Sequence, residues 1–331
     1  MTDRPQLSVI VITHNREDQV VECVLLLSRL EAGATDPELI VVLDSCSDRS
    51  LERLSSLRTE IGSRLVLESI QANSPAVARN RGVDLAHGSI LVFLDDDVRP
   101  SRELLDAHLR SQQTSDVVIG YLSPGLALKN DWWQLGARIW WEDRFTAMRQ
   151  PGYVLAYHDL FSANFSVKSS LFRAAGGFDK DCPRLEDYEL GIRLLKAGAS
   201  FSYNPKASVV HMETGSSRRW LDRASLEALG ELHIGRKHPD LRKSVFQDRL
   251  HHQDCLVAMW KSRFRAAAFR RNALLDMSVK IAGSFLPFLE SIKAWQTWRN
   301  IMGGAFEYNY WMTIARHFET ESQFLSWVDG L

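Results

Sequence analysis

The segment ILVFLDDDVRP, residues 90–100, places a short apolar run directly before three successive aspartates. The run is continuously apolar rather than alternating, which is typical of a strand buried on both faces of a parallel sheet. Adjacent carboxylates repel each other and raise each other's pKa unless a cation or a positive dipole compensates. The segment therefore predicts a buried strand whose acidic end needs a compensating charge, which a divalent cation would supply.

Comparable apolar runs lie on both sides of this segment. They occupy residues 7–13, 39–44, 64–70 and 116–122. Segments of helical length and pattern follow Asn15, Asp48, Pro75 and Ser101. Alternation of such strands and helices indicates βαβ units. We therefore predict the α/β class, with a doubly wound, mostly parallel sheet flanked by helices.

Polar residues follow each of the first four predicted strands. The clusters are THN (13–15), DSCSD (44–48), NSPAVARN (73–80) and DDD (95–97). In open α/β sheets, ligands bind in the crevice at the carboxyl ends of the strands. We expect these four clusters to form one binding site.

Composition limits the classes of partner and the location. Of the 331 residues, 45% are hydrophobic and 24% charged, and a net charge of -1 gives no reason to expect a nucleic-acid partner. The four cysteines lie far apart without a CxxC pair, which favours reduced thiols over a disulfide framework. No signal-peptide pattern occurs, and no apolar run approaches the roughly 18 residues of a spanning helix. We expect a cytoplasmic protein.

The usual nucleotide-binding motifs are missing. The sequence has neither GxGxxG after a strand nor GxxxxGK, so a bound nucleotide would need side chains and a metal for its phosphates. Asp95, Asp96 and Asp97 can supply these contacts, because Mg²⁺ and Mn²⁺ prefer carboxylate oxygens and retain sites for water and phosphate. A solvated loop before a helix would show the same three residues, and the triplet alone leaves both interpretations open.

A second acidic pair begins a predicted helix in PRLEDYELGIRLLKAG, residues 183–198. Leu190, Leu194 and Ala197 mark one apolar face, and Gly198 is a plausible end. Glu186 and Asp187 then occupy the first turn, where the helix dipole favours an ionised carboxylate that can accept a proton. Carboxylates are also ordinary at helix starts, so the pair alone does not decide for catalysis.

Five segments together resemble the family 2 glycosyltransferases with the GT-A fold. They are LSVIVITHNRE, ELIVVLDSCSD, VARNRG, VFLDDDV and LEDYELGIRL, in this order, within about residues 7–212. The resemblance implies a GT-A domain over 1–222, with a nucleotide-binding half at about 1–122 and an acceptor half at about 123–222. The region 223–331 is rich in helix formers, arginines and aromatics, and we expect it to be helical.

The resemblance also implies roles for residues in the donor half. Thr13, Asn15 and Arg16 match the loop that contacts the nucleotide, and Asp44 matches the carboxylate that reads its base. Leu43 stands where the family commonly has a second acidic residue, which leaves the base open.

Further roles follow for the ARN element, the acidic triplet and the second acidic pair. Arg79 and Asn80 match residues near the diphosphate and sugar. Asp95 is expected near the ribose and sugar, with Asp96 also in the donor site, and Asp97 on the metal. Asp95 and His211 are further candidate metal ligands, although a lone histidine is more often structural. Asp187 matches the catalytic base, and Glu186 beside it would contact acceptor or sugar.

These roles imply a metal-dependent transferase. A sugar would pass from a nucleotide-diphosphate donor to a hydroxyl of a glycan, a lipid-linked sugar or a small molecule, with Mg²⁺ or Mn²⁺ as the cofactor. A base opposite the leaving group inverts the anomeric carbon. A sugar-nucleotide nucleotidyltransferase is an alternative, but THNREDQ lacks the Gly-rich loop expected there. A non-catalytic nucleotide-sugar-binding protein is a third interpretation.

The acceptor side and the C-terminal region are less specific. KNDWWQLGARIWWEDRF, residues 129–145, contains two tryptophan pairs; Trp133 and Trp140 favour packing on a helix face over contact with an acceptor sugar. MWKSRFRAAAFRRNALL, residues 259–275, is basic and aromatic at helical spacing. Such a helix packs against its own protein or a second subunit, or lies on a membrane surface, and both a homodimer and peripheral membrane contact stay open.

Overall fold

The computed structural model describes residues 5–30, 36–125, 132–212, 217–250, 269 and 273–329. These residues belong to two compact units. The first comprises described parts of Met1–Leu126, Arg138–Lys180 and Glu186–Glu213. The second comprises those of Ala127–Ala137, Asp181–Leu185 and Thr214–Leu331.

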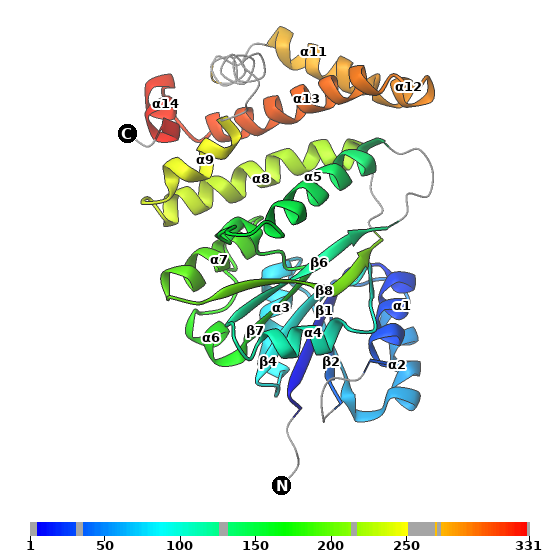
Figure 1. The fold of residues 1–331 in the computed structure, drawn as a ribbon. Coiled ribbons are helices and arrows are strands. Elements are labelled where there is room, and N and C mark those ends of the chain that lie inside the picture. Colours follow the sequence, from blue (N-terminus) through cyan, green and yellow to red (C-terminus); the bar gives the residue numbers. More distant parts are fainter. Residues whose placement is uncertain are drawn as a thin grey trace. The chain divides into compact units, whose positions relative to one another are not determined.

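The first unit is built on one sheet whose described residues form eight strands, in the order β3-β2-β1-β4-β7-β6-β8-β5 (Figure 1). The strands are β1 (Leu7–Thr13), β2 (Glu38–Asp44), β3 (Leu65–Ile70), β4 (Ile90–Asp95), β5 (Val98–Pro100), β6 (Val117–Pro124), β7 (Asn164–Lys168) and β8 (Phe201–His211). Strands β3, β2, β1 and β4 are parallel, and so are β6 and β8. Strands β7 and β5 run antiparallel to their neighbours.

Helices follow the strands as the sequence predicts. They are α1 (Glu17–Leu27), α2 (Ser50–Ile61), α3 (Pro75–Leu85), α4 (Leu104–Ser111), α5 (Trp132–Met148), α6 (Ser169–Ala174) and α7 (Glu186–Lys196), with 3-10 turns η1 (Gly62–Arg64) and η2 (Tyr157–Asp159). Every residue of β2 is buried, as are all of β1 except Ile12, which confirms the prediction from continuously apolar runs. The predicted apolar face of α7 holds for Leu190 and Leu194 but not for Ala197, which is exposed.

Aromatic packing on β4 fixes the elements around the acidic triplet. The ring of Phe93 stacks on Phe165 of β7 at 4.8 Å and lies 5.3 Å from both Phe172 and Phe178. Phe172 belongs to α6, and Phe178 is the last residue of the loop AAGGF at residues 174–178. Because all four rings are buried, this loop is held against the strand that carries Asp95.

A short antiparallel pair brings the end of β8 to the acidic triplet. Val98 of β5 pairs with His211, the last residue of β8, and the backbone N–H of Met212 donates to the carbonyl of Asp97 at 2.8 Å. The pairing joins positions more than 100 residues apart in the chain. It places the imidazole of His211 beside the carboxylate of Asp97.

A buried polar chain joins α4 to β7. The side-chain amide of Asn164 donates to the carbonyls of Tyr121 and Ala207, so its oxygen accepts from Nε2 of His108 at 2.9 Å. Nδ1 of His108 then accepts from the hydroxyl of Ser166, also at 2.9 Å. Because one ring nitrogen donates and the other accepts, the imidazole of His108 is neutral. Burial lowers the pKa of His108 to about 4.

The second unit is helical in its described residues. Its helices are α8 (Ser217–Lys237), α9 (Arg242–Leu250), α11 (Ala273–Ser284), α12 (Leu286–Ser291), α13 (Trp295–Ala315) and α14 (Glu321–Asp329). Buried Phe246, Trp311 and Phe324 bring α9, α13 and α14 together. The predicted boundary between residues 222 and 223 falls inside α8, and the assignment of functional halves stays a prediction. Among the described helices, none is long and apolar enough to cross a bilayer.

Cys23 and Cys182 are buried and Cys46 is half-buried, and the expected reduced state of the cysteines stays a prediction. Cys255 lies outside the described residues, and so does most of the basic segment 259–275.

Candidate active site

The acidic triplet lies at the end of β4, and its middle residue faces the protein. Thr13 Oγ1 donates to Oδ2 of Asp96 at 2.7 Å, and Nη1 of Arg16 donates to Oδ1 at 2.8 Å. Asp96 is 4% exposed. Burial outweighs these two partners and raises the pKa of Asp96 to about 6. Both oxygens of Asp96 are therefore engaged by the loop after β1.

Asp97 is also buried, but one of its oxygens lacks a hydrogen bond. Arg16 Nη1 donates to Oδ2 at 2.8 Å, whereas Oδ1 lies 3.3 Å from Nε2 of His211 and has no hydrogen-bond partner. Burial opposes the charge of Asp97, yet the nearby His211 and Arg16 bring its pKa below the ordinary value. A buried carboxylate oxygen in this state is suited to a cation.

Three side chains form a group that can hold a metal. Ligand atoms of Asp95, Asp97 and His211 all lie within 4.8 Å of one another. Two carboxylates and an imidazole fit Mn²⁺, and carboxylate oxygens fit Mg²⁺. Oδ1 of Asp97 has no hydrogen bond and lies beside His211, another member of this group, so the residues present fit a divalent cation.

Arg79 connects the triplet to the second acidic pair. Its Nη2 donates to Oδ1 of Asp95 at 3.0 Å, and its Nη1 donates to Oε1 of Glu186 at 2.7 Å. The guanidinium lies 5.6 Å from the centre of the Phe178 ring. Arg79 is 5% exposed, and the two carboxylates keep its pKa above the ordinary value despite burial.

Asp187 lies in the first turn of α7 with one oxygen held by a neighbouring loop. The backbone N–H of Ser162 donates to Oδ2 at 3.0 Å, and that of Tyr188 donates to Oδ1 at 2.9 Å. Leu185, directly before the helix, has a left-handed φ of 64°. Burial is the main cause that raises the pKa of Asp187 to about 6, and the charge of Glu186 adds to it. The two N–H groups and Arg79 act in the opposite direction but do not outweigh them. Such a carboxylate is ionised near pH 7 and can accept a proton.

The loop that holds Asp187 is itself anchored by a buried ion pair. Asp159 in η2 is fully buried, accepts from Nη2 of Arg144 at 2.9 Å, and accepts from the backbone N–H of Ala156 at 2.9 Å. A Cβ on Gly191 of α7 would meet the carbonyl of Tyr157 at 2.8 Å, so only glycine permits this close approach.

Asn80 holds the loop that follows α6. Its Nδ2 donates to the carbonyl of Phe178 at 2.8 Å, and its Oδ1 accepts from the N–H of Phe178 at 2.9 Å. Gly177 has a φ of 73°, and a Cβ there would meet Oδ1 of Asn80 at 2.7 Å. Asn80 thus orients the segment that packs against Arg79.

Asp44 and Asn15 organise the loops after β2 and β1. Asp44 accepts from the N–H groups of Ala72, Asn73 and Ser74 at 2.8–2.9 Å. Burial opposes its charge, but these donors lower its pKa overall. Asn15, at a left-handed φ of 53°, accepts from the N–H of Ser47 at 2.7 Å.

The structure thus gathers the predicted residues at the ends of the strands, in two linked groups. Thr13, Arg16, Asp96, Asp97, Asp95 and His211 form one; Arg79 joins it to Glu186 and Asp187. Asp44, Asn15 and Asn80 hold backbone loops instead. Their contacts with a nucleotide sugar stay predictions.

Sequence reasoning missed two supports of the site. The N–H of Ser162 and the pair of Asp159 with Arg144 position the loop beside Asp187, but no local motif marks them. The side chains of Trp133 and Trp140 lie outside the described part of the chain. Trp141 is described and packs on Phe161 at 4.6 Å.

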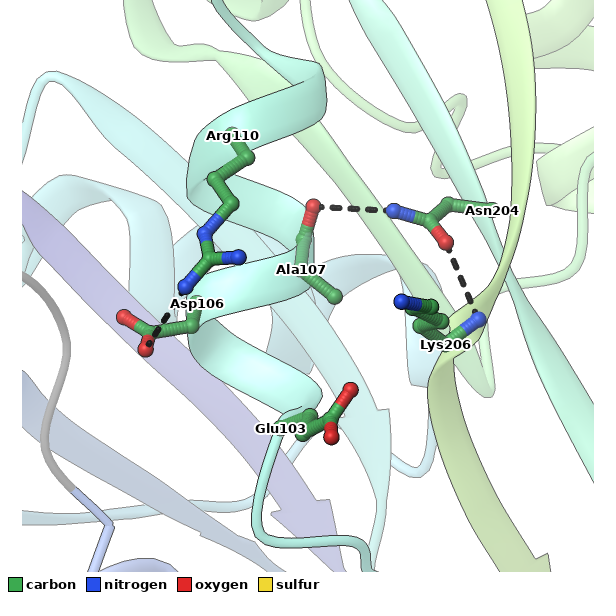
Figure 2. Close-up of a pocket in the computed structure, with 6 residues that line it drawn as sticks. All are labelled: Glu103, Asp106, Ala107, Arg110, Asn204 and Lys206. Atoms are coloured by element: carbon green, nitrogen blue, oxygen red, sulfur yellow. Dashed lines mark hydrogen bonds and ion pairs between the residues drawn. The ribbon is translucent and has the colours of Figure 1, made fainter.

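A separate pocket lies between α4 and β8 (Figure 2). Its lining includes Asn204, whose amide donates to the carbonyl of Ala107 at 3.2 Å, and Asp106, which pairs with Arg110 at 3.7 Å. None of the predicted site residues lines it. Because the predicted site residues gather at the strand ends, we place the chemistry there rather than in this pocket.

Known proteins share both the sequence pattern and the fold. The profile described as glycosyl transferase family 2 matches residues 8–175, half of the chain. The chain belongs to glycosyl transferase family 2. Pre-mycofactocin glycosyltransferase of Mycobacterium tuberculosis is 29% identical over 181 residues, which cover 53% of this chain and 38% of that protein.

A second relative aligns over more of the chain. Validoxylamine A glucosyltransferase of Streptomyces hygroscopicus subsp. limoneus is 25% identical over 276 residues, 73% of this chain and 59% of that protein. This family 2 chain therefore matches less than two thirds of the length of either relative.

Solved structures show the same GT-A fold. A mannosyltransferase from Pyrobaculum calidifontis, in complex with GDP-Man and Mn²⁺, has a TM-score of 0.61 at 18% identity and covers 92% of this chain and 86% of its own. Residues 1–349 of TarS from S. aureus have a TM-score of 0.51 at 16% identity, with 90% of each chain covered.

Proposed function

We propose that this family 2 chain is an inverting glycosyltransferase that moves a sugar from a nucleotide-diphosphate donor to a hydroxyl acceptor. The observation that carries the proposal is the link through Arg79. On one side of Arg79 stands a metal-capable group that includes Asp95, and on the other stands Glu186, next to the proton acceptor Asp187. Glycosyl transfer needs both parts, since charge must be stabilised on the leaving group while a base activates the acceptor.

Asp95, Asp97 and His211 would hold Mg²⁺ or Mn²⁺. When bound, the cation supplies positive charge where the departing diphosphate develops negative charge. Two fold neighbours support a nucleotide-sugar donor, because one is in complex with GDP-Man and Mn²⁺ and another with UDP-GlcNAc. Thr13, Arg16 and Asp96 keep the loop after β1 beside this group.

Asp187 acts as the general base in the proposed reaction. The acceptor oxygen attacks the anomeric carbon while its proton passes to a carboxylate oxygen of Asp187. The bond between the anomeric carbon and the diphosphate oxygen breaks, and its electron pair leaves with the nucleoside diphosphate. Attack opposite the leaving group inverts the anomeric carbon.

The experiment compares Asp187→Asn with the wild type. We expect turnover to fall about 10²–10⁴-fold, the usual contribution of a general base, while binding of nucleoside diphosphate with Mn²⁺ stays unchanged in calorimetry. Asp84→Asn, an exposed aspartate on α3, is the matched control and should keep full activity. Undiminished turnover in Asp187→Asn would mean that the residue is not the base.

Chelation separates the enzyme from a non-catalytic binding protein. We expect EDTA to abolish sugar transfer, and added Mn²⁺ to restore it. Donor binding without turnover under any metal condition would favour the binding protein.

A further inference from the structure

The second unit carries an exposed apolar stripe on α11 and α12. Its members are Met277, Ile281, Phe285, Phe288 and Ile292, each 51–56% exposed. Their spacing of four, four, three and four residues follows one face of a helix. Backbone hydrogen bonds continue through Phe285, the residue between the two helices: its N–H donates to the carbonyl of Ala282 at 3.1 Å, and its carbonyl accepts from the N–H of Leu289 at 3.0 Å. The five side chains therefore form one strip.

The opposite face of the same helices is already packed. Leu286 is buried with Trp298 and Met302 of α13, and Leu289 packs against this cluster. The indole of Trp298 donates to Glu290 at 2.8 Å. Helix α13 runs back alongside α11 and α12 (Figure 1). The stripe is thus a second, outward apolar face.

The exposed charged side chains described next to the stripe are cationic. Residues 276–299 contain Lys280, Lys293 and Arg299, all exposed. Their two acidic residues are Glu290, which is bonded to Trp298, and Asp276, which precedes Met277 in α11. An apolar face with cations at its border is the pattern of a helix that lies in the interface of an anionic bilayer.

We propose that α11 and α12 dock on an anionic lipid surface, with the stripe in the interfacial region and Lys280 and Lys293 near the lipid headgroups. A second copy fits less well, because a two-fold contact through this face would gather the exposed cations of both chains in one interface. None of the described helices can span a bilayer, which is consistent with a surface position. The inference is independent of the proposed reaction.

Vesicle co-sedimentation of the full chain tests the proposal. We expect the wild type to sediment with vesicles of phosphatidylcholine and phosphatidylglycerol, and much less with phosphatidylcholine alone. The double variant Phe285→Ser with Phe288→Ser should lose at least ~10-fold in partitioning, since two large apolar groups leave the interface. Lys280→Glu with Lys293→Glu should weaken binding most at low salt.

The matched control is Leu51→Ser with Leu226→Ser, which removes two apolar residues of 45% and 44% exposure elsewhere. It should bind vesicles like the wild type, and circular dichroism of every variant checks folding. Equal sedimentation of the phenylalanine variant, or no sedimentation of the wild type, overturns the proposal. So does a wild-type dimer in ultracentrifugation that the phenylalanine variant converts to a monomer without any vesicle binding.

Discussion

Replacing Arg79 with methionine should destabilise the folded chain by about 3–5 kcal/mol, the usual cost of removing one partner from a buried ion pair. The side chain of Arg79 is 6% exposed and donates to Asp95 and Glu186 at 3.0 and 2.7 Å. Methionine keeps most of the volume but leaves both carboxylates without their shared cation. Their mutual repulsion and desolvation then oppose folding.

Arg81→Met is the matched control on the same helix. Arg81 pairs with Glu68 at 2.7 Å, but its side chain is 42% exposed, and surface pairs contribute about 0–1 kcal/mol. Urea unfolding followed by tryptophan fluorescence measures both variants. Equal losses in the two variants would refute the argument that burial makes Arg79 the critical cation.

Two pH predictions and one loop prediction follow from the same geometry. Asp187 must be ionised to accept a proton, and its pKa is raised to about 6. The value of kcat/KM should therefore rise as pH increases through about 6 and then level off. A profile that is flat from pH 5 to 8 would argue against Asp187 as the base. His108 has a pKa of about 4 in the folded chain, below its ordinary value of about 6.5. Because the unfolded chain therefore binds the proton at higher pH, the free energy of unfolding should fall by about 3 kcal/mol as pH drops from 6.5 towards 4. In urea titrations across this range, the difference between wild type and His108→Gln should carry that slope, and a constant difference would contradict the neutral tautomer. Asn80→Ala should cost about 1–3 kcal/mol by leaving the buried N–H and carbonyl of Phe178 unpaired, whereas Asp84→Asn should leave the urea midpoint unchanged.

The parallel part of the sheet could be predicted because its strands are continuously apolar. In strand β4, Ile90–Asp95, the first five residues are apolar and all five are buried. Strand β7, Asn164–Lys168, does not, although its first four residues are buried. Asn164 and Ser166 are satisfied by His108 and by distant carbonyls, and no local pattern reveals such partners.

The site could be predicted as a set of polar clusters at the strand ends, but the contacts that join these clusters could not. Asp97 and His211 meet only because the three-residue strand β5 pairs with the end of β8. Arg79 joins Asp95 to Glu186, which lies 107 residues after Arg79 in the chain, and α3 holds Arg79 in place by packing against β1 and β2. Contacts of this range depend on the assembled sheet and leave no spacing signal in the sequence.

Manganese binding to Asp97 variants tests the central claim most directly. Electron paramagnetic resonance with a nucleoside diphosphate present should show a Mn²⁺ site in the wild type and in Arg81→Met. We predict that Asp97→Asn weakens this site at least ~10-fold, since it removes the charge of the buried carboxylate whose Oδ1 has no hydrogen bond. Unchanged Mn²⁺ affinity in Asp97→Asn would contradict the account.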